Sequence, residues 1–134
     1  MREKTKLFVA LPVVLLLVTM PTGSRAQDGV KRTDLQTHDL SIPGREVVQQ
    51  MVELQPGTVV GKHTHPGEEV TVVLEGELRL EVAGKAAVTV KAGQAFTVPS
   101  GEVHSAAAAA GRVPTKLLAT YIVEKGKPLR TAVP

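Results

Sequence analysis

Apolar and polar residues alternate with a period of two along most of the chain, and turn residues interrupt the alternation at short intervals. The clearest case is residues 77–83, where Leu78, Leu80 and Val82 alternate with charged residues. Successive side chains of a strand point to opposite faces, so this pattern is typical of a strand with one buried face. Further strands are predicted at residues 45–54, 58–65, 69–75, 86–91, 94–99 and 116–124. Helix-length periodicity is absent after residue 26, so the sequence predicts an all-β sandwich or barrel.

The segment 69–75 departs from clean alternation because it is apolar on both sides. Val70, Val72 and Leu74 share one face, and Val73 lies on the other. Apolar residues on both faces indicate a strand that is covered on both faces. One face would line the interior, and the other would meet a second sheet, the N-terminal arm or a partner subunit. We expect a partner subunit, and therefore a homodimer.

Five consecutive alanines, residues 106–110, form the other irregular segment. Alanine is the best helix former, but five residues are too few for an unsupported helix. We interpret the run as a strand continuation or a loop. Its methyl groups would form an apolar wall near His104.

The first 26 residues have the pattern of a secretory signal peptide. Basic residues precede the apolar segment 7–20, and small residues at Ser24 and Ala26 give a cleavage site after Ala26. An uncleaved membrane anchor is disfavoured because the apolar segment is shorter than the roughly 20 residues that span a bilayer. We therefore expect a periplasmic or secreted protein with no membrane contact after cleavage.

The rest of the chain divides into an arm and one domain. Residues 27–44 are polar and contain glycine and proline, so they predict a mobile arm or an edge segment. Residues 45–134 form the predicted barrel domain. A domain of this size buries a modest core and gains stability from bound metal, from self-association or from both.

Composition excludes several classes of partner and ligand. The predicted signal peptide carries four of the 16 basic residues and one of the 13 acidic ones, so 12 of each remain. Equal numbers of basic and acidic residues give no electrostatic reason to expect a nucleic acid as a partner. Phe96 and Tyr121 are the aromatic residues after residue 26, so surfaces for base stacking are also missing. The chain has no cysteine, which excludes disulfides and thiolate ligands.

Three histidines and one glutamate carry the candidate chemistry. His63 and His65 are two residues apart, so on a strand their side chains point to the same face. Glu69 follows a Pro-Gly turn, and His104 comes from a later predicted strand. Together they would form a mixed nitrogen and oxygen site that suits a divalent transition metal. Fe(II), Mn(II), Ni(II), Co(II), Cu(II) and Zn(II) are all compatible with this set of ligands.

The two segments that carry these residues resemble the paired signature of the cupin superfamily. The first motif is Gly, five residues, His-x-His, three residues, Glu, six residues and Gly, and here its positions are Gly57, His63, His65, Glu69 and Gly76. The second is Gly, five residues, Pro-x-Gly, two residues and His, and here its positions are Gly93, Pro99, Gly101 and His104. The spacing between the motifs resembles that of compact bacterial single-domain cupins. The resemblance covers residues from about 45 to 124.

The resemblance implies a double-stranded β-helix, or jelly-roll, barrel with one metal ion. His63, His65, Glu69 and His104 would be its ligands, with each imidazole neutral and bound through one ring nitrogen. One position departs from the family pattern, because Ala108 stands where the family has an asparagine. The asparagine is not a ligand, so metal binding survives its loss. A polar contact to a substrate beside His104 would be missing.

Other polar residues are weaker candidates. Tyr121 is by default a packing aromatic, although its hydroxyl is a possible proton donor near the metal. Gln49 would orient a ligand if its face of strand 45–54 lined the cavity, and otherwise it faces solvent. His38 in the arm and Glu68 beside Glu69 are interpreted as surface residues.

Three functions are compatible with these residues. The first is a metal-dependent enzyme that acts on an oxygen-rich small molecule. By analogy with the family, quercetin-type dioxygenase chemistry comes first, followed by isomerase or lyase chemistry. The second is a non-catalytic periplasmic protein that binds a metal or a small ligand. The third is a structural barrel with a vestigial site, which the complete set of four ligands disfavours.

Overall fold

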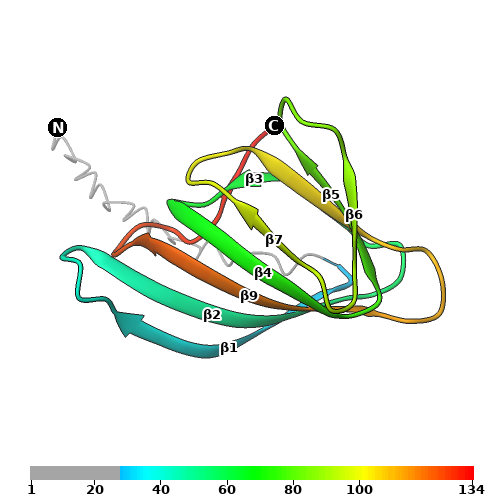
Figure 1. Ribbon diagram of the computed structural model, residues 1–134, viewed down its shortest axis with the longest axis horizontal. Helices are drawn as coiled ribbons and strands as arrows, with labels where there is room; N and C mark the ends of the chain where they lie inside the picture. The colour runs from blue at the N-terminus through cyan, green and yellow to red at the C-terminus, as the bar shows by residue number, and fades with distance from the viewer. Residues whose placement is uncertain (1–27) are drawn as a thin grey trace, which may run out of the picture.

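The computed structural model describes residues 28–134, and they form two five-stranded antiparallel sheets (Figure 1). The predicted signal peptide lies outside the described residues. The first sheet has the order β1-β2-β9-β4-β7, and the second has the order β10-β3-β8-β5-β6. The strands are β1 (Val30–Asp39), β2 (Arg45–Leu54), β3 (Val59–Thr64), β4 (Gly67–Glu75), β5 (Glu77–Val82), β6 (Val88–Lys91), β7 (Ala95–Val98), β8 (His104–Ala108), β9 (Thr115–Glu124) and β10 (Thr131–Ala132). This arrangement confirms the predicted all-β fold. Residues 28–134 contain no helix with the length and apolar character that crossing a bilayer requires.

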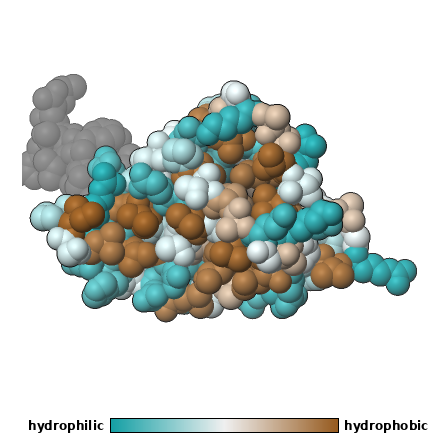
Figure 2. All heavy atoms as spheres, in the orientation of Figure 1, coloured by the Kyte–Doolittle hydropathy of each residue, from teal (hydrophilic) through white to brown (hydrophobic). Residues whose placement is uncertain are grey.

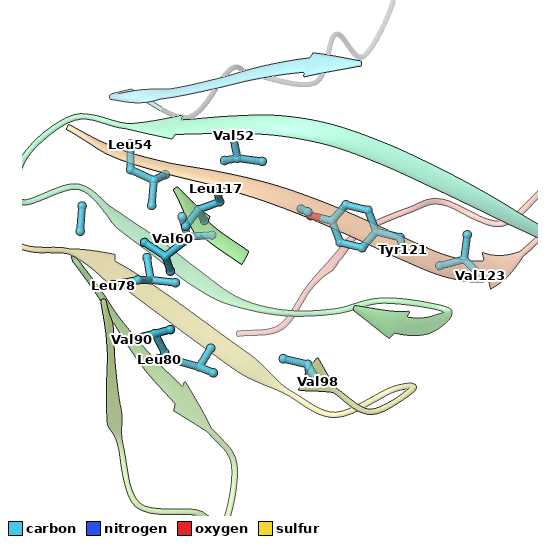
Figure 3. Close-up of a cluster of buried hydrophobic side chains, with 13 residues drawn as sticks. Val52, Leu54, Val60, Leu78, Leu80, Val90, Val98, Leu117, Tyr121 and Val123 are labelled. Carbon is cyan, nitrogen blue, oxygen red and sulfur yellow. The ribbon is translucent and has the colours of Figure 1, made fainter. Parts of the chain in front are cut away.

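The core lies between the two sheets and is built from short aliphatic side chains (Figure 3). The pattern of β9 is strictly alternating, and its inward residues include Leu117 and Tyr121. From the second sheet, Leu78 and Leu80 of β5 face them and are fully buried or nearly so. The alternation that predicted the strands therefore also selects the face that is buried.

The predicted arm contains a strand. Residues 30–39 form β1, which pairs with β2 at the edge of the first sheet and has a bulge between Asp34 and Gln36. The sequence predicts a mobile arm or an edge segment here, and in the structure residues 30–39 are an edge strand. The polar character of β1 fits this place, because an edge strand that faces solvent is protected against pairing with other chains by charged residues.

The alanine run forms most of β8 and faces the interior at alternate positions. Ala106 and Ala108 pair with Leu80 and Leu78 of β5, and Ala108 is 5% exposed. Of the two interpretations of the run, the strand is correct for Ala106–Ala108. The missing asparagine is replaced by a methyl group that packs in the core.

Segment 69–75 is covered on one face in the single chain, so a partner subunit stays as the expected cover of the other face. Inward residues of β4 alternate with Val70 and Leu74, which remain 39% and 44% exposed on the outer face. The second sheet packs on the inner face of the first sheet, and β1 lies beside β2 at the edge of that same sheet. Neither of them therefore covers these two side chains. The outer face of this sheet therefore carries exposed apolar side chains among polar ones (Figure 2, brown).

Two glycines allow the close approach of β4 and β9. A Cβ atom on Gly67 would lie 2.0 Å from the carbonyl oxygen of Ile122, so the strands pair closely only because no side chain is present. Gly76 ends β4 with a φ of 75°, which is a conformation that other residues rarely adopt. Together they fix the two ends of the strand that carries Glu69.

Candidate metal centre

The first and second sheets each bring one side of the site. On the second sheet, His63 of β3 lies directly opposite His104 of β8. On the first sheet, Glu69 of β4 pairs with Tyr121 of β9. His65 follows β3, in the short connection through which the chain crosses to β4. The three histidines and Glu69 are up to 41 positions apart in the sequence, but the sandwich brings them to one point.

The four predicted ligands form one buried group. One donor atom from each of His63, His65, Glu69 and His104 lies within 4.8 Å of all the others. All four residues are no more than 6% exposed. An oxygen of Glu69 lies 3.1 Å from Nε2 of His65 and 3.2 Å from Nε2 of His104. The group can therefore hold one metal ion.

Backbone carbonyls set the orientation of all three imidazoles. Nδ1 of His63 lies 2.8 Å from the carbonyl oxygen of Gly61, and Nδ1 of His104 lies 3.0 Å from that of Glu102. Nδ1 of His65 lies 2.6 Å from the carbonyl oxygen of Leu129. Since a carbonyl only accepts, each Nδ1 carries the proton and donates it. Each Nε2 is then left as the metal ligand, which is the usual arrangement around protein-bound metals.

Thr71 orients the carboxylate in the same way. Its hydroxyl donates a 2.7 Å hydrogen bond to Oε1 of Glu69, two residues earlier on the same face of β4. Thr71 is fully buried. The other oxygen, Oε2, faces the two imidazoles. Sequence reasoning missed Thr71, although its place on the inward face was readable from the alternation.

The chemistry of these donors fits a divalent transition metal. Nε2 of His65 is a buried ring nitrogen that has no hydrogen-bond partner among the described residues. Two ligand atoms that are each about 2.1 Å from one ion, at a right angle, lie about 3 Å apart. The 3.1 Å and 3.2 Å separations from Glu69 to the imidazoles match that spacing. A buried nitrogen that makes no hydrogen bond within residues 28–134 and lies within 4.8 Å of three further donor atoms is what a metal ion would satisfy.

Burial and the carboxylate give the ionisable groups different charges in the metal-free protein. Burial lowers the pKa of His63 from 6.5 to about 3, so this imidazole is neutral. Burial would raise the pKa of Glu69, but the hydrogen bonds with His104 and Thr71 and the close contact with His65 outweigh it and lower the pKa. Burial also opposes the charged form of His104, but the bond to Glu69 prevails and raises its pKa. Because ligands bind metal in their deprotonated form, metal uptake releases any proton that His104 holds.

The metal-free protein is expected to lose stability in acid. Between pH 6.5 and about 3 the unfolded chain protonates His63, whereas the folded chain does not, so the free energy of unfolding falls as the pH falls. Glu69 adds to this loss below its ordinary pKa of 4.5. The stability from the raised pKa of His104 is fully present below 6.5, so it does not offset the loss. Urea midpoints of chelator-treated protein should therefore decrease between pH 6.5 and 4.5.

A matched variant identifies the group responsible for this acid sensitivity. His63→Asn removes the imidazole, so its urea midpoint should change less than that of the unmodified protein over the same pH range. If the urea midpoint changes equally with pH in the variant and in the unmodified protein, His63 does not titrate as described.

The side chains around the four ligands are mostly apolar. A cavity of about 40 Å³ lies between the sheets and is lined by residues such as Phe96, Leu117 and Ala106. Tyr121 also lines it, and its ring centre lies 4.7 Å from that of His65. Figure 3 shows Tyr121 on β9, and its side chain is buried in the core cluster between the sheets. The structure therefore brings this candidate to the metal group.

The structure does not bring Gln49 to the metal group. Its amide nitrogen donates to Oγ1 of Thr120 at 3.1 Å, and its carbonyl oxygen accepts from Gln36 at 2.7 Å. Thr120 alternates with the buried Ala119 and Tyr121, so this contact lies on the outer face of the sheet. The role for Gln49 as an orienting residue inside the cavity is wrong, because its face of β2 points away from the core. His38 and Glu68 are exposed, as expected.

The sequence of the chain is similar to that of a known domain family and of curated proteins. The sequence pattern of the cupin domain family matches residues 50–121. Over 64 residues the chain is 39% identical to the HTH-type transcriptional regulator PuuR of Escherichia coli (strain K12), an alignment that covers 47% of this chain and 34% of the regulator. The chain thus spans about a third of the length of the curated relatives that it matches.

Solved structures share the fold at low identity. A cupin superfamily protein from Desulfitobacterium hafniense has a TM-score of 0.60 and 17% identity, over 75% of this chain and 84% of that one. Oxalate oxidase in complex with the substrate analogue glycolate has a TM-score of 0.63 and 23% identity, over 81% of this chain and 57% of that one. At these identities the likeness extends to the fold alone.

Proposed function

The chain belongs to the cupin family, and from that premise we propose that it is a metal-dependent enzyme acting on an oxygen-rich small molecule. The observation that carries the proposal is the buried group of three imidazoles and one carboxylate, with every Nδ1 turned away from its centre. Four protein ligands leave one or two positions open on a five- or six-coordinate ion. An open position is what a catalytic site has and a structural site lacks.

Different residues would bind the metal and exclude water from the site. A divalent metal, when bound, would supply a Lewis acid that polarises a chelating oxygen atom. His63, His65, Glu69 and His104 would hold it. The aliphatic side chains that line the cavity exclude water from the inner side of the site. Dioxygenase-type chemistry is the reaction class that we place first, with isomerase and lyase chemistry behind it.

Tyr121 is the side chain best placed to move a proton. Burial raises the pKa of its phenol, so Oη keeps its proton near neutral pH and acts as a donor and not as a base. The Tyr121→Phe variant is expected to bind metal as the unmodified protein does. Its turnover of any substrate should fall by about 100-fold, the lower end of what general acid catalysis contributes. Unchanged turnover in this variant would leave Tyr121 a packing residue.

A substrate panel tests the proposed activity. Protein loaded separately with Fe(II), Mn(II), Ni(II) and Cu(II) would be incubated with flavonols, catechols and uronates, and oxygen consumption and product formation would be followed. Turnover by one metal form, abolished in a His65→Ala variant, is the expected result. Absence of turnover with every metal form, in protein that binds metal stoichiometrically, would contradict an enzyme of this type.

A non-catalytic binding protein is the second candidate. Apart from the four ligands, the titratable side chains that line the inner cavity in the described part of the chain are Arg32 and Tyr121. Neither serves as a general base near neutral pH. In this alternative, the same group captures a metal or a chelating ligand. The panel separates the two candidates, since the binding protein would take up metal without turnover.

We also propose that the protein acts outside the cytoplasm as a homodimer. The segment 1–26 supports export, with cleavage after Ala26. Support for the dimer comes from the outer face of the first sheet, where a row of apolar residues crosses three strands. This row consists of Met51 of β2, Leu118 of β9 and Val72 of β4, which are register partners. Exposed Val70 and Leu74 extend it along β4, and a second copy of the same face would cover it.

Substitution on this face tests the dimer. Val70→Glu places a charge in the row, and we expect light scattering to show a shift from dimer to monomer mass. Val113→Glu is the matched control, since Val113 is 60% exposed in the loop between β8 and β9. A dimer that persists in the Val70→Glu variant, or a monomer in the unmodified protein, would contradict this interface.

A further inference from the structure

Two arginines stand at the mouth of the barrel, over the group of four ligands. Arg32 and Arg130 line one pocket of about 200 Å³ together with His63, His65 and Tyr121. Arg32 also lines the inner cavity, so it lies where the pocket and the cavity meet. The pocket is thus the outer side of the same site.

The fold places the two guanidinium groups from distant parts of the chain. Arg32 of β1 pairs with Val52 of β2, whose side chain is 5% exposed in the core, so Arg32 is on the inward face of the sheet. Arg130 directly precedes β10, which pairs with β3 at His63. Its neighbour Leu129 provides the carbonyl that orients His65. One tail segment therefore serves both the metal ligand and the pocket.

Neither arginine has an acidic partner among the described residues. Nε of Arg130 is buried and has no hydrogen-bond partner in residues 28–134. Its Nη2 makes one long bond, 3.4 Å, to the carbonyl oxygen of Gly61. Asp34, two residues after Arg32, accepts a hydrogen bond from Gln50 at 2.7 Å. Burial and the charge of Arg32 lower the pKa of Arg130, the direction expected for two cations that line one pocket.

A buried donor without an acceptor in the described residues, beside a second like charge, favours an acceptor that is itself an anion. A divalent ion held by one carboxylate and three neutral imidazoles would add a further positive charge. Carboxylates match the planar fork of donors that a guanidinium presents. The pocket is smaller than the roughly 300–1,000 Å³ of sites for drug-sized ligands, so its volume favours a compact acid.

We propose that Arg32 and Arg130 bind the carboxylate of a small organic acid, and that a second oxygen of this acid reaches the His63-His65-Glu69-His104 group. This assignment rests on the proposed function in one respect, namely that the second oxygen has a metal ion to bind. A carboxylate bound by the two arginines would mean that the oxygen-rich substrate is an anion. The arginines would position the acid, and Tyr121 would lie beside it on the pocket wall.

Calorimetric titration of malonate into the full-length Zn(II)-loaded protein tests the assignment. Malonate carries two carboxylates on a three-carbon chain, and its neutral dimethyl ester is the probe without charge. We expect malonate to bind and the ester to bind at least tenfold more weakly. Arg32→Gln and Arg130→Gln should each weaken malonate binding by about tenfold or more, as expected for a lost charge-assisted hydrogen bond. Their zinc content should stay unchanged.

Arg112→Gln is the matched control, because Arg112 is exposed in the loop after β8, beyond the strand end opposite His104. It should bind malonate as the unmodified protein does. Arg32 and Arg130 come from different segments, so the test survives if one variant fails to fold. Equal malonate binding in the unmodified protein and in both arginine variants, with zinc bound in all three, would overturn the anion site and leave the proposed function intact. Protein that takes up no zinc but binds malonate through both arginines would support the anion site and refute the proposed function.

Discussion

Replacing His65 by alanine is expected to abolish stoichiometric metal binding. His65 supplies the one ring nitrogen of the group that is buried without a hydrogen-bond partner, and its Nδ1 is held at 2.6 Å by the carbonyl of Leu129. Loss of a residue that only orients a ligand typically costs 10–100-fold in affinity, so loss of the ligand itself should cost at least about 100-fold. Elemental analysis after dialysis, followed by competition with a chelating dye, measures the change.

His38 offers a matched control within the same chain. It lies on the exposed edge strand β1, away from the other three histidines, so His38→Ala should bind metal as the unmodified protein does. Both proteins should contain about one metal ion per chain, as the single group of four ligands implies. Metal that remains stoichiometric and tight in His65→Ala would place the ion elsewhere and remove the basis of the proposed enzyme.

Much of the fold could be predicted because strand alternation is a local property. The run from Glu77 to Val82 alternates in the sequence and forms β5 with Leu78 and Leu80 in the core. The His-x-His spacing likewise places two imidazoles on one face without any knowledge of the partner strands. His63 and His65 are therefore positioned by the sequence around them, and the glycines that bound the motifs allow the turns.

Contacts that depend on how distant strands meet could not be predicted. Local alternation correctly groups Gln49 with Met51, but it does not say which face of β2 is inside. The carbonyl of Leu129 becomes a partner of His65 only because the tail returns to β3. The approach of Arg32 and Arg130 has the same cause, since 98 positions separate them and only the closed sandwich brings them to one pocket. A carbonyl oxygen also has no signature in a sequence.

The outer face of β4 shows where a sequence pattern is ambiguous. Apolar residues on both sides of a strand predict cover on both sides, but they do not name what provides it. In the single chain Val70 and Leu74 remain open. Of the three covers that the pattern allowed, the single chain provides neither the second sheet nor the arm, and the proposed dimer is the one that remains.

Bound metal is expected to raise the melting temperature of the protein by about 10 °C or more. Zn(II) at about 100 times its dissociation constant adds about 2.7 kcal/mol to the free energy of unfolding, provided that it binds only the folded chain. In a domain of this length, each kcal/mol corresponds to about 4–8 °C. The chain has no cysteine and therefore no disulfide that would make the metal redundant. Calorimetric melting of the protein with Zn(II), and again after chelation, measures the shift.

The Glu69→Gln variant separates this effect from nonspecific binding of zinc. The substitution keeps the size of the side chain and one oxygen beside the Thr71 hydroxyl, but it removes the buried negative charge that faces Nε2 of His65 and His104. The metal-free variant should fold, because a neutral amide is easier to bury than a carboxylate. Its melting temperature should respond to Zn(II) far less than that of the unmodified protein, because the charge that offsets a divalent cation is gone. A melting curve of the unmodified protein that chelation leaves unchanged would mean that the four donors meet without an ion, and that hydrogen bonds among them are sufficient to hold the barrel together.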